Sequence, residues 1–347
     1  MGHVRGRREQ RKGTQGPYLT AAGLGLLLAL VLFLLPGLLV GPLESESDQP
    51  QTMQPLQPSQ SAAGGRDAAR TVLLQRQDGS VEELTMEDYL WGVVAAEMPA
   101  KFEPEALKAQ AAAARTYTVR LQSSATPKHE GAHLCDNSGC CQAYTDKSAA
   151  LTRWGLQAEE FGDKIARAVS ETDGMGILYE GVPIQAVFFS SAAGRTVDAV
   201  EVWGNSVAYL KSVDSPEGEN VPNWRSQVVL TAQEAGQLIL TKYPGADLSG
   251  SPEGWLGAPE YSASGCVSKM TVGGVTLTGP QVRSLFSLRS SSFSVSCQED
   301  SFTFDVTGYG HGVGMSQYGA NTMAAGGSDF RDILTWYYTG TQIGPLW

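Results

Sequence analysis

After its first twelve residues the sequence has little positive charge. Five of its 25 Lys and Arg residues, but only one of its 36 Asp and Glu residues, lie in positions 1–12. The rest of the chain therefore carries 20 basic and 35 acidic residues, a net charge of −15. Proteins that bind nucleic acid use clustered Lys and Arg to displace counterions from phosphates. Because the chain is acidic, we do not expect it to bind nucleic acid.

The sequence also lacks the patterns of fibrous and disordered chains. It contains 40 Gly and 17 Pro residues, but they follow no Gly-X-Y repeat, and 42% of the residues are hydrophobic. This composition excludes collagen and wholesale disorder. Because a domain usually takes about 100–200 residues, the chain has room for one large or two modest domains.

No charged residue occurs between Lys12 and Glu44. Within this stretch, residues 19–40 form an apolar run, LTAAGLGLLLALVLFLLPGLLV, that as a helix is long enough to cross the roughly 30 Å hydrocarbon core of a bilayer. The basic tail 1–18 precedes the run and acidic residues follow it, so the positive-inside rule predicts a cytoplasmic N-terminus. A cleaved signal peptide is the alternative, but its apolar region is shorter and ends at a small-x-small cleavage site, which this run lacks.

Residues 41–70 are predicted to form a flexible linker, because they contain many Pro, Gln and Ser and few large apolar side chains. We therefore expect a single-pass protein of the cell membrane whose extracytoplasmic domain spans residues 71–347. The outside of the membrane lacks ATP, which argues against kinases and synthetases. Hydrolytic, lytic or binding work on envelope material is favoured instead.

The extracytoplasmic domain is expected to begin with two strands around an Asp78–Gly79 turn, followed by a helix capped by Thr85. Helical spacing from Leu90 and Val93 places Glu97 on the apolar face of this helix. A carboxylate there loses hydration, which raises its pKa toward the range that a general acid needs. The alternative is that Glu97 caps a helix end or pairs with a buried Arg.

A second helix is predicted from Pro104 to about Gln122, because proline favours the first turn of a helix. Its many alanines form a narrow stripe, bordered by Gln110, that allows close packing against a neighbour. We interpret it as a core helix.

Cysteine and histidine are most concentrated in residues 128–144, KHEGAHLCDNSGCCQAY. This segment holds three of the five cysteines and two of the four histidines. Four imidazole or thiolate ligands at short loop spacings close a tetrahedral zinc site. The candidate ligands are His129, His133, Cys135, Cys140 and Cys141. Disulfide chemistry is the alternative, although it leaves the histidines unexplained and adjacent cysteines do not easily both find partners. Cys266 and Cys297 are expected to be either a disulfide or buried thiols.

Three later segments complete the pattern. Residues 177–214 alternate strand-forming residues with turns. They contain a loop of small residues, Ser190–Gly194, which either lines a polysaccharide-binding cleft or only connects two strands. Residues 222–300 are predicted to form a subdomain with one helix and several strands. In residues 308–327 the glycines allow close backbone approach to a ligand, and His311 is either a structural histidine or the partner of a catalytic group or sugar hydroxyl.

Five blocks of this sequence resemble the stage II sporulation protein D family over roughly residues 71–347. The blocks, in chain order, are VVAAEMPAKFEPEALKAQAAAARTY, HLCDNSGCCQAY, FFSSAAGRTVDAVEVWGNSVAYLKSVDSPEG, SLRSSSFSV and GHGVGMSQYGA. The AAEMP and GHGVGMSQYGA blocks are the most specific. One departure is the loop Ala192–Gly194, where the family usually has Ser-Gly-Gly.

The resemblance implies a membrane-anchored lytic transglycosylase that cuts peptide-stripped peptidoglycan glycan strands during engulfment in sporulation. It further implies that Glu97 is the catalytic acid and base, that the Cys-rich loop (residues 128–144) holds zinc at His129 or His133, Cys135, Cys140 and Cys141, and that stage II sporulation proteins P (an amidase) and M are partners. Because four protein ligands close the site to water, the zinc ion is expected to be structural. Residues expected to bind the sugar or to orient Glu97 are Ser191, Arg195, Tyr209, His311, Ser316, Gln317 and Tyr318.

Two other functions compete with this interpretation. One is a non-catalytic module that binds glycan and enhances a cell-wall amidase, and the other is a zinc hydrolase with an open coordination position. A serine hydrolase is disfavoured because residues 314–319, GMSQYG, do not match G-x-S-x-G. The predicted fold is α+β, with early helices and a curved mixed β-sheet that carries the smaller inserted subdomain, after one N-terminal transmembrane helix.

Overall fold

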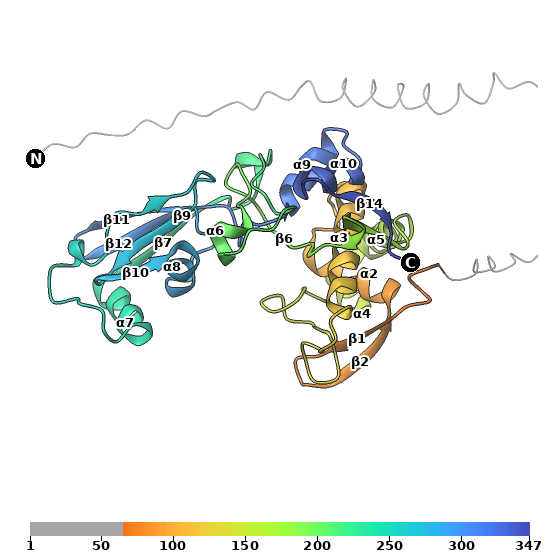
Figure 1. The fold of residues 1–347 in the computed structure, drawn as a ribbon, viewed down its shortest axis with the longest axis horizontal. Helices are drawn as coiled ribbons and strands as arrows, with labels where there is room; N and C mark the ends of the chain where they lie inside the picture. The colour runs from red at the N-terminus through yellow and green to blue at the C-terminus, as the bar shows by residue number, and fades with distance from the viewer. Residues whose placement is uncertain (1–64) are drawn as a thin grey trace, which may run out of the picture. The chain divides into compact units, whose positions relative to one another are not determined.

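The computed structural model describes residues 65–347 (Figure 1). The predicted basic tail 1–18, the predicted membrane span 19–40 and most of the predicted linker 41–70 lie outside the described residues. Among residues 65–347, no helix is both long and apolar enough to cross a membrane.

The described residues form a mixed α and β fold (Figure 1). The helices are α2 (Met86–Glu97), α3 (Pro104–Gln122), α4 (Lys147–Trp154), α5 (Ala158–Ser170), α6 (Ala199–Trp203), α7 (Ala232–Lys242), α8 (Gly279–Leu285), α9 (Gln317–Ala325) and α10 (Phe330–Tyr337), with short 3₁₀ turns at Gly155–Gln157, Gly218–Asn220 and Pro252–Gly254. The strands are β1 (Thr71–Gln75), β2 (Val81–Thr85), β3 (Leu134–Cys135), β4 (Met175–Tyr179), β5 (Val182–Pro183), β6 (Phe188–Phe189), β7 (Arg225–Thr231), β8 (Glu260–Tyr261), β9 (Val267–Val272), β10 (Val275–Thr278), β11 (Phe293–Gln298), β12 (Ser301–Thr307), β13 (Met315–Ser316) and β14 (Gln342–Pro345).

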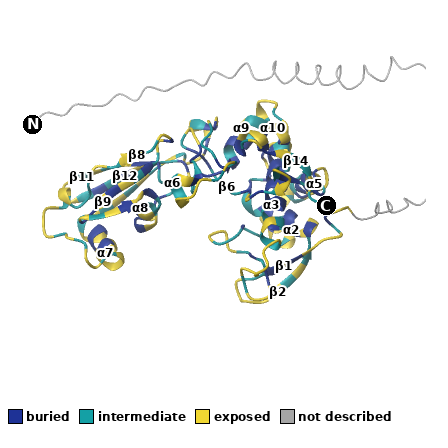
Figure 2. Ribbon diagram, viewed as in Figure 1, coloured by how far each residue is buried: buried dark blue, intermediate teal, exposed yellow. Residues whose placement is uncertain are grey.

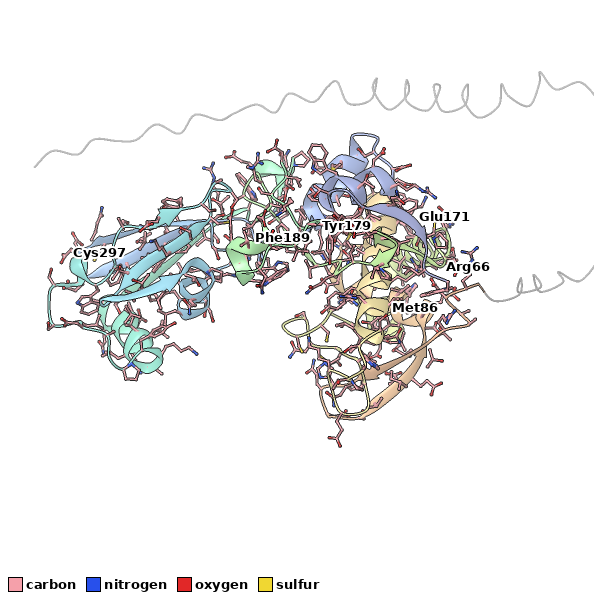
Figure 3. The ribbon with its side chains drawn as sticks, viewed as in Figure 1. Arg66, Met86, Glu171, Tyr179, Phe189 and Cys297 are labelled. Carbon is pink, nitrogen blue, oxygen red and sulfur yellow. The ribbon has the colours of Figure 1, made fainter. Side chains whose placement is uncertain are left out.

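Ordered contacts begin before Thr71, inside the segment predicted as linker. Asp67 is only 2% exposed, and its carboxylate accepts hydrogen bonds at 2.6–3.0 Å from the guanidinium of Arg115. The backbone N–H groups of Arg66 and Asp67 donate to the Asp173 carboxylate at 2.7 and 2.8 Å, which ties this segment to the residues that follow α5 (Arg66 is labelled in Figure 3). Residues 65–70 are therefore part of the folded body.

The first hairpin and the first helix form as local sequence signals predict. β1 pairs antiparallel with β2, and Gly79 in the turn has φ +85°, a conformation that favours glycine. The Thr85 hydroxyl then accepts the N–H of Asp88 at 3.1 Å and caps α2. The helix begins after Thr85 and ends at Glu97, so Glu97 is its last residue.

Helix α3 is the centre of the first hydrophobic core, and α2, α5, α9 and α10 contact it. The alanines at 106, 109 and 111–114 are fully buried, so neighbouring helices approach it closely. Figure 2 shows the helix as largely buried along its length. The prediction of a core helix beginning at Pro104 is therefore confirmed.

The structure has several small sheets in place of the one curved sheet that the sequence predicted. They are β2-β1-β3, β14-β4-β5, β13-β6, β10-β9-β8 and β11-β12-β7. The strand-forming residues between 175 and 214 are interrupted by turns and by α6, so their strands stay short. The two-residue parallel pair β6–β13 is nevertheless important, because it joins the Ser190–Gly194 loop to the glycine-rich segment near the C-terminus.

A second hydrophobic core lies between the antiparallel sheet β11-β12-β7, the sheet β10-β9-β8 and helices α7 and α8. Helix α7 packs against β7 and β12, and its N-cap Thr231 forms a capping box with Glu234. The helix expected near Thr231–Lys242 and the strands expected nearby are confirmed. The proposal that residues 222–300 form a subdomain stays a prediction.

Candidate active site and metal centre

Glu97 lies at the C-terminal end of α2 and is partly buried. Its Oε1 accepts the backbone N–H of Ala143 at 2.7 Å, and its Oε2 accepts a hydrogen bond from Gln317 Nε2 at 3.1 Å. These donors come from two distant segments, the Cys-rich loop and the start of α9. The carboxylate is therefore held at both oxygens by neutral groups.

Burial raises the pKa of Glu97 above its ordinary value, although the hydrogen bonds from Ala143 and Gln317 act in the opposite direction. Within residues 65–347, no Lys, Arg or His lies within ion-pair distance of this carboxylate. The buried arginine of the neighbouring helix, Arg115, pairs with Asp67 instead. The alternative in which Glu97 pairs with a buried Arg is thus wrong for this fold.

Gln317 reaches Glu97 because of where α9 starts. Strand β13 pairs with β6, and Ser316 at its end caps α9 by accepting the N–H of Gly319 at 3.2 Å. Gln317 is the first helical residue and is 5% exposed. Its amide also lies 3.5 Å from Gln110 Oε1 of α3, so it bridges two helices and the candidate acid.

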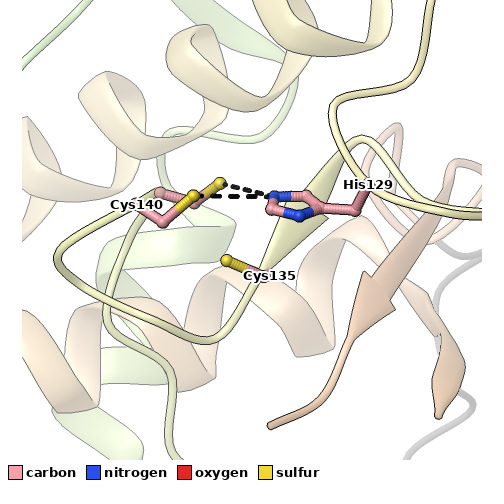
Figure 4. Close-up of side chains that lie close together, drawn as sticks. His129, Cys135 and Cys140 are labelled. Atoms are coloured by element: carbon pink, nitrogen blue, oxygen red, sulfur yellow. Dashed lines mark hydrogen bonds between the residues drawn. The ribbon is translucent and has the colours of Figure 1, made fainter. Parts of the chain in front are cut away.

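His129, Cys135, Cys140 and Cys141 form a cluster that can hold a metal ion, with their ligand atoms within 4.8 Å of one another. Figure 4 shows the sulfur atoms of Cys135 and Cys140 beside the imidazole of His129. His129 Nε2 lies 3.4 Å from Cys141 Sγ and 3.8 Å from Cys140 Sγ. Those distances are close to the roughly 3.5–3.8 Å edges of a tetrahedron built from ordinary zinc–sulfur and zinc–nitrogen bond lengths.

His133 is the candidate ligand that does not join the cluster. Its Nε2 lies 3.3 Å from the backbone oxygen of Ser124, outside the group of four. The disulfide alternative is also not realised, because all five cysteines are free thiols, including Cys266 and Cys297. The Cys266 thiol lies 3.0 Å from the Ser292 hydroxyl.

The metal cluster and Glu97 are joined by a short piece of backbone. Cys141 is followed by Gln142, which is 2% exposed and donates to Tyr89 OH at 3.0 Å and to Thr118 Oγ1 at 3.2 Å. Ala143, which donates to Glu97, comes next. The donor that faces the carboxylate therefore lies two residues after the last candidate ligand, Cys141.

His311 makes the contacts of a structural histidine, one of the two roles that the sequence left open, and its predicted role toward a catalytic group or a sugar stays a prediction. Val313 N–H donates to its Nδ1 at 3.2 Å, and its Nε2 lies 3.0 Å from the carbonyl oxygen of Phe188. Both ring nitrogens are thus used by backbone groups, which fits the neutral Nε2–H tautomer. Burial lowers the pKa of His311 to about 4.

The lowered pKa of His311 predicts acid sensitivity. The unfolded chain binds a proton at this histidine below pH ~6.5, whereas the native chain does so only near pH 4, so stability is lost as the pH falls between these values. Urea unfolding at pH 7 and pH 5 measures this loss. In a His311→Gln variant the loss is expected to be smaller, and an identical pH dependence in the variant would contradict the assignment.

The other candidate sugar ligands fall into two groups. Ser191 and Ser316 are 3% and 0% exposed, which disfavours direct contact with a glycan and leaves the predicted alternative, a role in orienting Glu97. Arg195 is exposed and pairs with Asp214, while Tyr209 accepts Gln185 N–H at 3.0 Å. Tyr318 is partly exposed and packs edge-on against Phe102 with ring centroids 4.9 Å apart. The sugar-binding roles of Arg195, Tyr209 and Tyr318 stay predictions.

Two groups that contact the site residues were missed by the sequence analysis. One is the backbone N–H of Ala143, which has no side-chain signal. The other is Glu217, a buried carboxylate that accepts the Ser316 hydroxyl at 2.5 Å. Glu217 follows a Ser-Pro pair in an irregular segment, so no periodicity could have indicated its burial.

Comparisons with known proteins agree with one another. The family model described as stage II sporulation protein matches residues 69–179. Stage II sporulation protein D of Bacillus subtilis is 37% identical over 333 residues, which span 93% of this chain and 95% of that protein. The protein of the same name from Bacillus amyloliquefaciens is 35% identical over 91% of this chain and 93% of its own length. An amidase enhancer of Bacillus subtilis is 27% identical over 73% of this chain, but over only 40% of its own length.

Proposed function

The chain belongs to the stage II sporulation protein D family, and from this premise we propose that it is a lytic transglycosylase of peptidoglycan. Its substrate is the bond between N-acetylmuramic acid and N-acetylglucosamine in glycan strands stripped of stem peptides. The observation that carries the proposal is the Glu97 carboxylate, which is partly buried, has a raised pKa and forms no ion pair with a cation of residues 65–347.

The proposed reaction uses one carboxyl group for both proton transfers. Protonated Glu97 donates to the glycosidic oxygen as the bond from that oxygen to muramic acid C1 breaks. The C6 hydroxyl of the same sugar attacks C1, and its proton returns to the Glu97 carboxylate. The products are a 1,6-anhydromuramyl end and a free N-acetylglucosamine end. Most glycosidases use two carboxylates, but here the C6 hydroxyl replaces both the water and the enzyme nucleophile.

Gln317 and the Ala143 N–H orient the acid in this scheme. Both hydrogen bonds favour the carboxylate form, while burial favours the neutral acid. The balance keeps Glu97 able to give a proton and to take one back. Because Gln317 approaches from α9 and Ala143 from the Cys-rich loop, neither oxygen is free to rotate away.

We assign the metal cluster to zinc with a structural role. His129, Cys135, Cys140 and Cys141 would be the ligands, and four protein ligands leave no position for a catalytic water. Bound zinc would supply a crosslink that fixes the loop carrying Ala143. This ligand set also disfavours the zinc hydrolase, which needs an open position.

The assignment of His129, and not His133, as a zinc ligand can be tested by substitution. His129→Ala is expected to lose most of the bound zinc, because it removes one of four ligands, whereas His133→Ala is the matched control and is expected to keep about one zinc per chain. Elemental analysis of the purified, dialysed variants measures this. Zinc loss in His133→Ala with retention in His129→Ala would contradict the assignment.

The setting of the reaction is part of the proposal. We place the N-terminal apolar run 19–40 as a single-pass anchor in the cell membrane, with residues 71–347 on its outer side, where glycan strands lie. The role would be in engulfment, alongside stage II sporulation proteins P and M. An amidase that strips stem peptides would supply the substrate.

Product analysis tests the proposal. The purified full chain is incubated with peptide-free glycan strands, and the ends are identified by mass spectrometry. Anhydromuramyl ends support the transglycosylase. Reducing muramyl ends would show hydrolysis instead, and intact strands would rule the enzyme out.

A second candidate function is favoured by the similarity to the amidase enhancer of Bacillus subtilis. In that case the chain would bind glycan without cutting it and would stimulate an amidase. Amidase assays with and without the full chain separate the two functions, since stimulation that survives Glu97→Gln points to the enhancer.

A further inference from the structure

Glu217 is a buried acid with an unusual environment. It is 3% exposed, yet among residues 65–347 no Lys, Arg or His forms an ion pair with it. Its Oε1 accepts the Ala192 N–H at 2.6 Å and the Ser316 hydroxyl at 2.5 Å, and its Oε2 has no hydrogen-bond partner in the described part of the chain. An unpaired buried carboxylate is costly, so its contacts need an explanation.

The two donors belong to the two segments that meet at the β6–β13 pair. Ala192 lies in the small-residue loop after β6, and Ser316 ends β13. Ser316 is also the N-cap of α9, where its hydroxyl oxygen accepts the Gly319 N–H. Glu217 therefore holds both segments at the point where α9 begins.

The first turn of α9 sits directly on this cluster. A Cβ at Gly319 would overlap the Tyr337 hydroxyl and would lie 2.8 Å from Glu217 Oε2, so only glycine fits there. Ser215 and Tyr337 join the same cluster through a 2.7 Å hydrogen bond between their hydroxyls. The first turn of α9 is therefore in close contact with Ser215, Glu217 and Tyr337.

Gln317 follows Ser316 directly and donates to Glu97. We infer that Glu217 is a positioning residue: through Ser316 and the first turn of α9 it holds the Gln317 amide against the Glu97 carboxylate. Its importance for catalysis rests on the proposed function, but the geometric claim does not. Glu217 itself touches neither Glu97 nor the substrate in this scheme.

Titration of the Glu97 carboxyl group tests the geometric claim without any activity. The full chain, with ¹³C-labelled glutamate, is followed by carbon NMR across pH in detergent, and Glu97→Gln identifies the Glu97 signal. Ala143 and Gln317 are the groups that face this carboxylate, and no charged side chain of the described residues contributes to its pKa. Loss of the Gln317 bond in Gln317→Ala is therefore expected to raise the pKa of Glu97 further.

Glu217→Ala is expected to raise it in the same direction, and the Glu217→Ala/Gln317→Ala double variant is expected to match Gln317→Ala alone. Glu217→Gln keeps Oε1 as an acceptor and is expected to restore most of the wild-type titration. Ser316→Ala removes the other end of the bond and serves if Glu217→Ala does not fold. The inference is overturned if Gln317→Ala moves the pKa while Glu217→Ala and Ser316→Ala leave it unchanged, or if Gln317→Ala itself has no effect.

Kinetics separate this inference from the proposed function. If the wild type yields anhydromuramyl ends, Glu217→Ala is expected to lower kcat about tenfold at unchanged KM, the effect of one hydrogen bond of ordinary strength. Unchanged kcat in a folded variant overturns the catalytic part of the inference. If the wild type makes no such ends, the proposed function fails and the NMR titration still decides the role of Glu217.

Discussion

Replacing Glu97 with Gln is expected to lower the rate of anhydromuramyl product formation by about 10²- to 10⁴-fold. The amide keeps the size of the side chain and can still accept the Ala143 N–H, so the fold should survive. It has no proton to give to the glycosidic oxygen. Mass spectrometry of timed digests of peptide-free glycan measures the rate.

The matched control is Glu87→Gln, which changes an exposed carboxylate at the other end of the same helix and is expected to leave the rate unchanged. The pH profile gives a second check. Because the first step needs protonated Glu97, the rate should fall as the pH rises through its pKa, which lies above the ordinary value for a Glu carboxyl group. A Glu97→Gln variant with the wild-type rate would leave the amidase enhancer as the better function.

The Asp67→Ala substitution is expected to lower the free energy of unfolding by about 3–5 kcal/mol. Arg115 is fully buried on α3, and Asp67 is the only carboxylate among the described residues that pairs with it. Asp67→Ala leaves that guanidinium without a counter-charge. Urea unfolding followed by tryptophan fluorescence measures the change.

Asp214→Ala is the control for this prediction. It breaks the pair with Arg195, whose side chain is 46% exposed, and is expected to cost less than about 1 kcal/mol. The double variant Asp67→Ala/Arg115→Met should recover part of the lost stability, because it removes the unpaired buried charge. Equal losses in Asp67→Ala and Asp214→Ala would show that the burial of Arg115 carries no such cost.

The parts of the site that the sequence predicted depend on local spacing. Glu97 falls on the buried side of α2 because it lies seven residues after Leu90, and Thr85 fixes where that helix begins. The metal ligands lie within thirteen residues, so one loop brings them together. The choice between His129 and His133 depended on how the loop turns, which spacing does not determine.

The parts that the sequence missed depend on segments that are far apart. The glycine-rich motif left open whether Ser316 binds the sugar or orients Glu97, and its contact with Glu217, 99 residues earlier, could not be read from the motif. The same motif left the role of His311 open, and its contact with the carbonyl oxygen of Phe188 depends on a strand more than a hundred residues earlier. The predicted single sheet failed similarly, because the pairing of short strands is decided by tertiary contacts and not by the residues of each strand.

The parallel pairing of β6 with β13 also has a consequence for the order in which the protein is made. Glu97, the Cys-rich loop and α3 all leave the ribosome long before Gln317, which lies 220 residues after Glu97. A growing chain can fold its N-terminal segments first, yet its candidate acid still lacks one of its two hydrogen-bond donors. The complete set of contacts around Glu97 therefore exists only after Gln317 has been made and β13 has paired with β6, so a chain that stops before this residue has the acid without its full support.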